Sequence, residues 1–441
     1  MNLPDKILVV GLGATGIATA KFFARLGKKV TITDTKKEED LIAALTDLKG
    51  VRFEGHFGGH RMDDFLSHPL IVISPGVDSE LPELKEARQR DIKVSGEIEL
   101  ASMFVKEPII AITGTNGKTT VTSLLGEIFT RAYEDVFVGG NIGNPLFNYV
   151  LEDRKAKYVI LEISSFQLET IETFRPTTSV LLNITEDHLD RYRNYEEYIT
   201  AKYRIFENQT KVDHAVLNKN LETTNDIKAN KLFFTTCEKL NEGAFFDNGN
   251  MYVRLGGREF VYKRALSPLI GIHNTENILS ALLVSHIYGI EQQVVEEVLR
   301  NFKGLAHRVE PIRELNGVRF YNDSKATNVD ATRRALESIE GKVILIAGGK
   351  DKGGSYKVIS DLMDKVKGLI LIGEAKERIS DELGKFAKTY MEKDLNSAAE
   401  RAFEIADTGD IVLFSPMCSS FDMFRDYKER GNIFKKIVES M

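Results

Sequence analysis

Short apolar runs alternate with amphipathic segments along most of the chain. Runs typical of buried strands occur at 7–10, 30–33, 70–73, 108–113, 158–163, 180–183, 343–347, 369–372 and 411–414. Periodic apolar positions predict helices at about 14–26, 119–131 and 273–288. Residues 211–263 are more polar and strand-like, and we expect sheet-edge or hairpin strands there. This alternation of buried strands and helices predicts α/β domains built on parallel sheets.

A glycine-rich turn follows the run at 108–113 and opens the next predicted helix. Its residues are Gly114, Thr115, Asn116, Gly117, Lys118, Thr119 and Thr120. Glycine-exposed N–H groups and a helix N-terminus together bind phosphates. We expect Lys118 to reach the β- and γ-phosphates of a nucleotide, and Thr119 or Thr120 to offer a hydroxyl to Mg²⁺. Ile112 stands where the standard phosphate loop has its first glycine, so the motif is a variant.

Possible metal ligands follow two further strands of the same segment. Glu162 lies near the end of the run 158–163, where a carboxylate beside a phosphate loop is well placed for Mg²⁺. Residues 184–190 follow the run 180–183 and include His188. Lys202 lies in a predicted helix, and its position alone predicts an ordinary solvated surface lysine.

A second glycine turn follows the first buried strand. Gly11, Gly13 and Gly16 form a GxGxxG pattern, and Asp34 lies 23 residues beyond the first glycine. This pattern recognises a diphosphate and a ribose, so it leaves both NAD and a UDP-linked ligand open. The turn at 74–76 ends a neighbouring strand and would close the same crevice.

Composition narrows the class of partner. Acidic residues outnumber basic ones by 65 to 59, and no long basic tract occurs, which argues against nucleic acid. The two cysteines, Cys237 and Cys418, are far apart and do not suggest a disulfide scaffold. We see no signal peptide and no apolar run long enough for a membrane span, so we expect a cytoplasmic protein acting on small molecules.

Length and the three glycine-punctuated segments predict three domains. A chain of 441 residues is too long for one ordinary domain. We expect a Rossmann-like domain at 1–96, a phosphate-loop ATPase-type α/β domain at 97–303, and a second Rossmann-like α/β domain at 304–441.

Taken together and in order, the motifs resemble those of the Mur ligases, ATP-dependent enzymes that add amino acids during peptidoglycan precursor synthesis. The segments that carry the resemblance are 114–120, 162–167, 185–190, 271–277, 307–310 and 322–328. Residues 11–16, 139–143, 323–328 and 415–422 look most like the member that adds D-glutamate to UDP-N-acetylmuramoyl-L-alanine. A sister ligase that adds another amino acid, or one acting on folate, is the nearest alternative; an NAD-dependent oxidoreductase is a distant one.

The resemblance implies an acyl-phosphate mechanism that yields ADP and phosphate, in a bacterial cytoplasmic enzyme that we expect to be monomeric. It implies UDP rather than NAD in the first domain, two Mg²⁺ ions, and a CO₂-derived carbamate on Lys202. The implied catalytic residues are Lys118, Glu162, His188, Lys202 and Lys325. The implied metal ligands are Thr119, Glu162, His188 and carbamylated Lys202.

The resemblance also implies three groups of binding residues. ATP contacts beyond the phosphate loop would be Asn277, Arg308, Asp323 and Lys325. UDP-substrate contacts would be Ala14, Thr15, Asp34, Thr35, Lys36, Ser74, Pro75, Gly76, Asn141 and His188. D-glutamate contacts would be Thr327, Lys352, Ser420, Phe421 and Tyr427.

Overall fold

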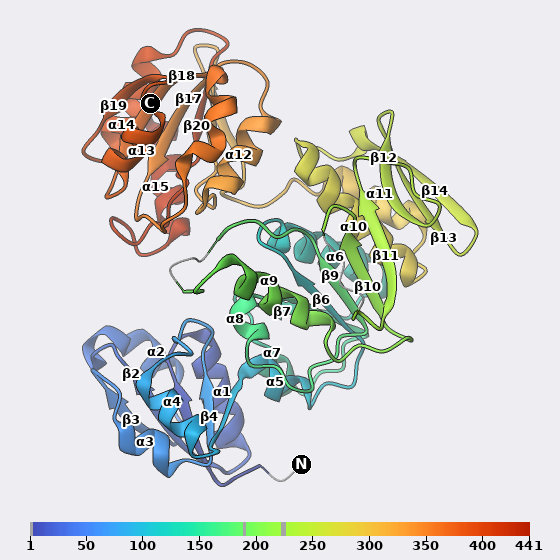
Figure 1. Cartoon of the computed structure of the whole chain (residues 1–441), viewed down its shortest axis with the longest axis vertical. Helices are drawn as coiled ribbons and strands as arrows, with labels where there is room; N and C mark the ends of the chain where they lie inside the picture. Colours follow the sequence, from blue (N-terminus) through green and yellow to red (C-terminus); the bar gives the residue numbers. More distant parts are fainter. Residues whose placement is uncertain (1–2, 188–190, 222–225) are drawn as a thin grey trace.

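Three α/β domains follow one another along the chain, each with its own sheet (Figure 1). The computed structural model describes residues 3–187, 191–221 and 226–441. The central domain lies between the first and the third. The predicted fold class is therefore confirmed. Among the helices in the described part of the chain, none is long and apolar enough to cross a membrane.

The first domain is a five-stranded parallel sheet in the order β3-β2-β1-β4-β5. Its strands are β1 (Lys6–Val10), β2 (Lys29–Asp34), β3 (Glu54–Phe57), β4 (Leu70–Ile73) and β5 (Lys93–Gly96). Its helices are α1 (Ala14–Arg25), α2 (Ile42–Asp47), α3 (Met62–Ser67) and α4 (Pro82–Gln89). From β1 the chain first adds β2 and β3 on one side and then β4 and β5 on the other. The glycine turn follows β1 at this switch point, which is where ligands bind in such sheets.

The central domain has a nine-stranded sheet in the order β14-β13-β12-β11-β10-β9-β6-β8-β7. Its strands are β6 (Ile109–Thr113), β7 (Val136–Gly140), β8 (Tyr158–Glu162), β9 (Thr178–Leu181), β10 (His214–Asn218), β11 (Asn230–Thr235), β12 (Gly243–Asp247), β13 (Asn250–Leu255) and β14 (Arg258–Lys263). Its helices are α5 (Glu97–Ser102), α6 (Lys118–Tyr133), α7 (Leu146–Leu151), α8 (Ser165–Leu168), α9 (Tyr195–Tyr203), α10 (Ile272–Ile287) and α11 (Gln292–Asn301).

The polar stretch at 211–263 differs in part from its prediction. β12, β13 and β14 form antiparallel hairpins at the sheet edge, as expected. However, β10 and β11 are parallel strands that continue the sheet inward, and β10 is almost fully buried. The local sequence did not show this because a short buried parallel strand has no alternation to distinguish it.

The third domain has a six-stranded sheet in the order β15-β16-β20-β17-β18-β19. Its strands are β15 (Glu310–Leu315), β16 (Val318–Asn322), β17 (Val343–Gly348), β18 (Val366–Ile372), β19 (Lys388–Met391) and β20 (Ile411–Phe414). Its helices are α12 (Val329–Ser338), α13 (Lys376–Leu383), α14 (Leu395–Ile405) and α15 (Tyr427–Ser440). Only the β15–β16 pair is antiparallel; the other pairs are parallel.

A strained linker leads into the third domain. Gly304, His307 and Val309 all have positive φ angles, of 84°, 65° and 45°. The left-handed region suits glycine but is a genuine outlier for a β-branched residue such as Val309. The backbone therefore turns sharply several times where the central and third domains connect.

Candidate active site

The phosphate loop lies between β6 and α6, and two of its glycines are required by the local geometry. Gly117 has a φ of 86° and directly precedes α6, and a Cβ there would lie 2.3 Å from the Asn277 side-chain oxygen. Gly114 has a φ of 153°, and its Cβ position would contact Leu182 and the backbone of Asn183. The loop therefore packs tightly against α10 and the end of β9.

Two lysines meet at one carbonyl of this loop. Nζ of Lys118 donates to the Gly114 and Thr115 carbonyls at 2.7 and 2.8 Å. Nζ of Lys202, from α9, donates to the same Gly114 carbonyl at 2.9 Å. Burial lowers the pKa of both amines, and the positive charge of Lys118 lowers the pKa of Lys202 further, to well below its ordinary value.

The prediction from position alone that Lys202 is a solvated surface lysine is wrong. Its side chain is 1% exposed. Helix α9 turns this face inward, and the ammonium lies 4.5 Å from the centre of the Tyr198 ring. Nine residues of weak apolar periodicity could not show which face of the helix is buried.

Glu162 presents a carboxylate oxygen that has no hydrogen-bond partner in the described part of the chain. Asn141 donates its amide to Oε1 at 2.8 Å. The other oxygen, Oε2, is buried and lacks a hydrogen-bond partner among the described residues. A buried carboxylate oxygen without a donor is costly unless a cation is bound there. This observation fits a Mg²⁺ ion, which prefers oxygen ligands.

The third domain contributes charged groups to the same cavity. Arg308 donates to the Thr119 hydroxyl at 2.9 Å, directly linking the third domain to the phosphate loop. Burial, helped by the charge of Arg308, lowers the pKa of Lys325 to about 7. Burial raises the pKa of Asp323 to about 7, although Ser415 donates to it at 2.7 Å.

One cavity thus gathers most of the predicted ATP, metal and catalytic residues. Its lining includes Thr115, Asn116, Gly117, Lys118, Thr119, Thr120, Asn141, Glu162, Lys202, Asn277, Arg308, Asp323, Lys325, Thr327 and Lys352. They come from the central and third domains, so neither domain forms the cavity alone. His188 lies outside the described residues. Among the residues that are described, no three His, Cys, Asp or Glu side chains gather as a metal site.

The residues implied for D-glutamate are only partly brought together. Thr327 and Lys352 line the cavity. Tyr427 lies next to it, with the Lys325 ammonium 3.9 Å from its ring centre. Ser420 is buried elsewhere, and the Phe421 side chain is 69% exposed; neither is among the lining residues.

The glycine turn of the first domain lies apart from this cavity, and none of its residues line it. Asp34 accepts hydrogen bonds from the backbone N–H groups of Leu12 and Lys36, at 2.7 and 2.8 Å. The Ser74 hydroxyl donates to the Gly11 carbonyl at 2.9 Å. A Cβ on Gly16 would come within 2.0 Å of that carbonyl, whereas the space beside Gly13 is open. The open side is where a diphosphate would approach the backbone. Thr35, Lys36, Pro75 and Gly76 lie on these same turns, and Ala14 and Thr15 begin α1 directly after the glycine turn.

Several polar contacts around the cavity were not predicted. Lys352 forms an ion pair with Asp187 at 3.5 Å, and Asn328 donates to Asp187 at 2.9 Å. Asp330 accepts from Asn116 at 2.7 Å, across the domain boundary. Asp187 lies in the segment 184–190 that was predicted to hold possible metal ligands, and Asn328 ends the motif 322–328. Asn328 is also the N-cap of α12. Its role at the cavity depends on which surfaces face each other.

Fold and cavity together define a three-domain α/β protein of the phosphate-loop class. Comparison with known families then gives three matches: "Mur ligase MurD-like, N-terminal domain" at residues 5–96, "Mur ligase middle domain" at 112–285, and "Mur ligase, glutamate ligase domain" at 307–418. The chain belongs to the Mur ligase family, and the resemblance seen in the sequence is confirmed.

Relatives that match the chain over nearly its whole length support the same family. The chain is 48% identical to a UDP-N-acetylmuramoylalanine–D-glutamate ligase of Geotalea daltonii, over 99% of this chain and 97% of that protein. It is 47% identical to the ligase of the same name from Geobacter metallireducens, with 99% and 97% covered. Among solved structures, the UDP-N-acetylmuramate–alanine ligase of Thermotoga maritima has a TM-score of 0.64 at 20% identity, covering 99% of both chains. That structural likeness shows the fold.

Proposed function

We propose that this protein is an ATP-dependent ligase that joins D-glutamate to UDP-N-acetylmuramoyl-L-alanine in the bacterial cytoplasm. The observation that carries the proposal is the single cavity in which the phosphate loop, Glu162 and Lys202 face Arg308 and Lys325 of the third domain. Relatives bearing the name of this activity match the chain over its whole length. We also propose domain boundaries near 96 and 304.

The first step of the proposed reaction transfers the γ-phosphoryl group of ATP to the substrate carboxylate. Lys118 and Lys325 would neutralise charge on the transferring oxygens, and Arg308 would hold the nucleotide from the other side. Asn277 lies against Gly117 and lines the same cavity, so it would contact the nucleotide. The product is an acyl phosphate on the terminal L-alanine.

In the second step the D-glutamate amine attacks the acyl carbonyl, and phosphate leaves from a tetrahedral intermediate. Thr327 and Lys352 would hold the incoming amino acid, because both line the cavity from the third domain. Ser420, Phe421 and Tyr427 remain proposed contacts. The first-domain turns around Asp34 and Ser74 would hold the UDP group at the far end of the substrate.

We propose that two Mg²⁺ ions bind in this cavity. Glu162 and Thr119 both line it, and two of their atoms would be oxygen ligands: the Glu162 oxygen that lacks a partner among the described residues, and the Thr119 hydroxyl once Arg308 releases it. His188 remains a proposed ligand. When bound, Mg²⁺ would stabilise the charge that develops on the phosphate oxygens. Lys202 fits a carbamate, because burial beside Lys118 favours the neutral amine that reacts with CO₂.

The test measures phosphate release from ATP and Mg²⁺ with UDP-N-acetylmuramoyl-L-alanine, with and without D-glutamate. L-glutamate, L-alanine, L-lysine and diaminopimelate serve as comparisons. We expect release that requires both the UDP substrate and D-glutamate. Release with a different amino acid would move the protein to a sister step of the family, and no release with any of them would refute the proposal.

A further inference from the structure

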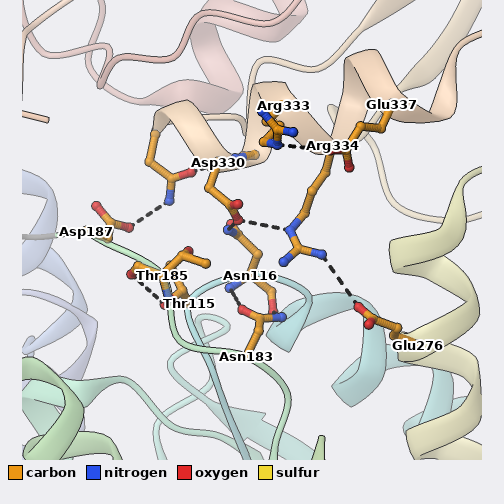
Figure 2. Close-up of polar contacts among 12 residues, drawn as sticks. Thr115, Asn116, Asn183, Thr185, Asp187, Glu276, Asp330, Arg333, Arg334 and Glu337 are labelled. Carbon is orange, nitrogen blue, oxygen red and sulfur yellow. Dashed lines mark hydrogen bonds and ion pairs between the residues drawn. The ribbon is translucent and has the colours of Figure 1, made fainter. Parts of the chain in front are cut away.

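A chain of polar side chains runs from the phosphate loop of the central domain to α12 of the third domain, and from there back to α10 of the central domain (Figure 2). Asp330 lies in the first turn of α12, and its Oδ2 accepts from Nδ2 of Asn116 at 2.7 Å and from Nε of Arg334 at 2.9 Å. Arg334 continues toward Glu276 on α10, with 3.6 Å between the charged atoms. Helix α12 therefore contacts the central domain at two places.

Hydrogen bonds with Asn183 fix Asn116, the residue at the phosphate-loop end of these polar contacts. The backbone N–H of Asn116 donates to the Asn183 side chain at 2.8 Å, and the Asn183 amide donates to the Asn116 carbonyl at 3.0 Å. Both backbone groups of Asn116 are therefore occupied, and its side chain is left to reach the third domain. A displacement of α12 would act on the loop through this one side chain.

In this series of polar contacts the cation Arg334 lies between two carboxylates, Asp330 and Glu276. The side chains of Asp330, Arg334 and Glu276 are 16%, 21% and 15% exposed, so solvent screens them little. Burial acts to lower the pKa of Arg334, but Asp330 and Glu276 outweigh it and the pKa is raised. Arg334 is thus a fixed cation that keeps the Asp330 carboxylate aimed at Asn116.

We propose that Asp330 and Arg334 are positioning residues, which align the phosphate loop with the third domain for phosphoryl transfer. The proposal rests on the proposed ligase function. The cavity needs Lys118 on the loop and Lys325 on the third domain at the same phosphate, and the chain through Asp330 sets their relative position. Neither Asp330 nor Arg334 reacts with substrate in this proposal.

The same helix offers a matched control. Arg333 is the neighbour of Arg334, but it pairs with Asp361 at 2.6 Å, within the third domain. It also pairs with Glu337 of the same helix at 3.0 Å (Figure 2). Replacing Arg333 removes the same charge from the same helix without touching the central domain. A second control, Asp330→Asn, removes the charge but keeps a side-chain oxygen that can accept from Asn116.

The experiment measures kcat for D-glutamate-dependent phosphate release and the Kd of a non-hydrolysable ATP analogue, in the full-length protein. We expect Arg334→Ala and Asp330→Ala to lower kcat about tenfold, with the analogue Kd changed less than about threefold. Arg333→Ala should stay within about twofold of wild type, and Asp330→Asn should retain most of the activity. The double variant should lose less than the product of the two single losses, because Asp330 and Arg334 are coupled by their own hydrogen bond, although Arg334 also has a contact of its own with Glu276.

Three results would overturn the proposal. They are equal losses in Arg333→Ala and Arg334→Ala, an Asp330→Asn variant as poor as Asp330→Ala, and unchanged kcat in all variants. An equal loss in the two Asp330 variants would mean that the acid only favours the helix N-terminus.

Small-angle scattering with the ATP analogue separates this proposal from the proposed function. It needs no turnover, and we expect Arg334→Ala, unlike Arg333→Ala, to be less compact than wild type. Scattering curves that are identical for the two variants would count against the positioning role, even if wild type proved to catalyse a different reaction.

Discussion

The central domain has two interfaces, called joints here, and they differ in chemistry: the joint with the first domain is apolar, and the joint with the third domain is polar. In the first joint, α1 of the first domain packs on α7, with the Phe22 ring stacked on Phe147 at 4.2 Å. One hydrophobic cluster runs through both domains, from Ile7 to Ala229. The second joint, between the central and third domains, consists of the polar contacts around Thr119, Asn116 and Asp187, and the third domain has separate hydrophobic clusters.

This difference matches what each joint has to do. Separating an apolar joint exposes surface at about 25 cal/mol per Å², so the first and central domains are expected to remain fixed. Polar contacts exchange with water at little net cost, so the second joint can form and break with substrate. The strained linker at Gly304–Val309 lies on that second, adjustable side.

The largest effect is expected on the polar side. Lys202→Ala should lower activity at least about 100-fold, because a preorganised group at the phosphate site is lost. Added small carboxylates such as formate should restore part of the activity by supplying the missing oxygen ligands. Phosphate-release assays check this, with the exposed Lys211→Ala as control; full activity of Lys202→Ala without rescue would contradict the proposed carbamate.

On the apolar side, the expected effect is on stability. Phe147 is fully buried between the two domains, so Phe147→Ala should lower the free energy of unfolding by about 3–5 kcal/mol. Activity per folded molecule should be kept. Urea titration measures the loss, and Phe386→Ala, at a 41% exposed position, should cost much less. Similar losses in the two variants would mean that the first joint is not a shared core.

Glu97 makes the first joint sensitive to pH. Its side chain accepts the Phe147 N–H at 2.7 Å, and burial raises its pKa to about 7, against 4.5 in the unfolded chain. The native state therefore holds a proton that the unfolded state releases, and stability falls as pH rises from about 4.5 to 7. The loss totals about 3 kcal/mol.

Glu97→Gln keeps the acceptor and removes this titration. The variant should gain stability over wild type as pH rises from 5 to 8, measured by urea midpoints at each pH. The exposed Glu39→Gln should show no such trend. A constant difference between Glu97→Gln and wild type across this range would contradict the raised pKa.

The smallest effect is expected at an ion pair that also crosses the first joint. Arg193 and Glu80 lie 3.4 Å apart, but their side chains are 76% and 49% exposed. Arg193→Ala should lower the free energy of unfolding, measured by urea titration, by no more than about 0.5 kcal/mol, because exposed pairs contribute little. A loss comparable with that of Phe147→Ala would show that charge, not packing, holds this joint.

Most of the architecture could be predicted locally. The strands at 70–73 and 411–414 have the predicted limits, because a continuous apolar run between turn residues is a local signal. The end of the strand predicted at 180–183 shifts to Leu181, because Asn183 leaves the strand to hold Asn116. Partners that are distant in sequence set such boundaries.

The sequence by itself determined the buried strands with continuous apolar runs, the glycine turns and the family, because these depend on residue type and spacing along the chain. Only the tertiary structure decided that Lys202 is buried, that Glu162 has an oxygen without a partner among the described residues, and that Asp330 reaches Asn116. The physical reason is distance along the chain. Burial and hydrogen bonding depend on surfaces that meet only after three domains have folded and packed, and no local pattern records which surfaces those are.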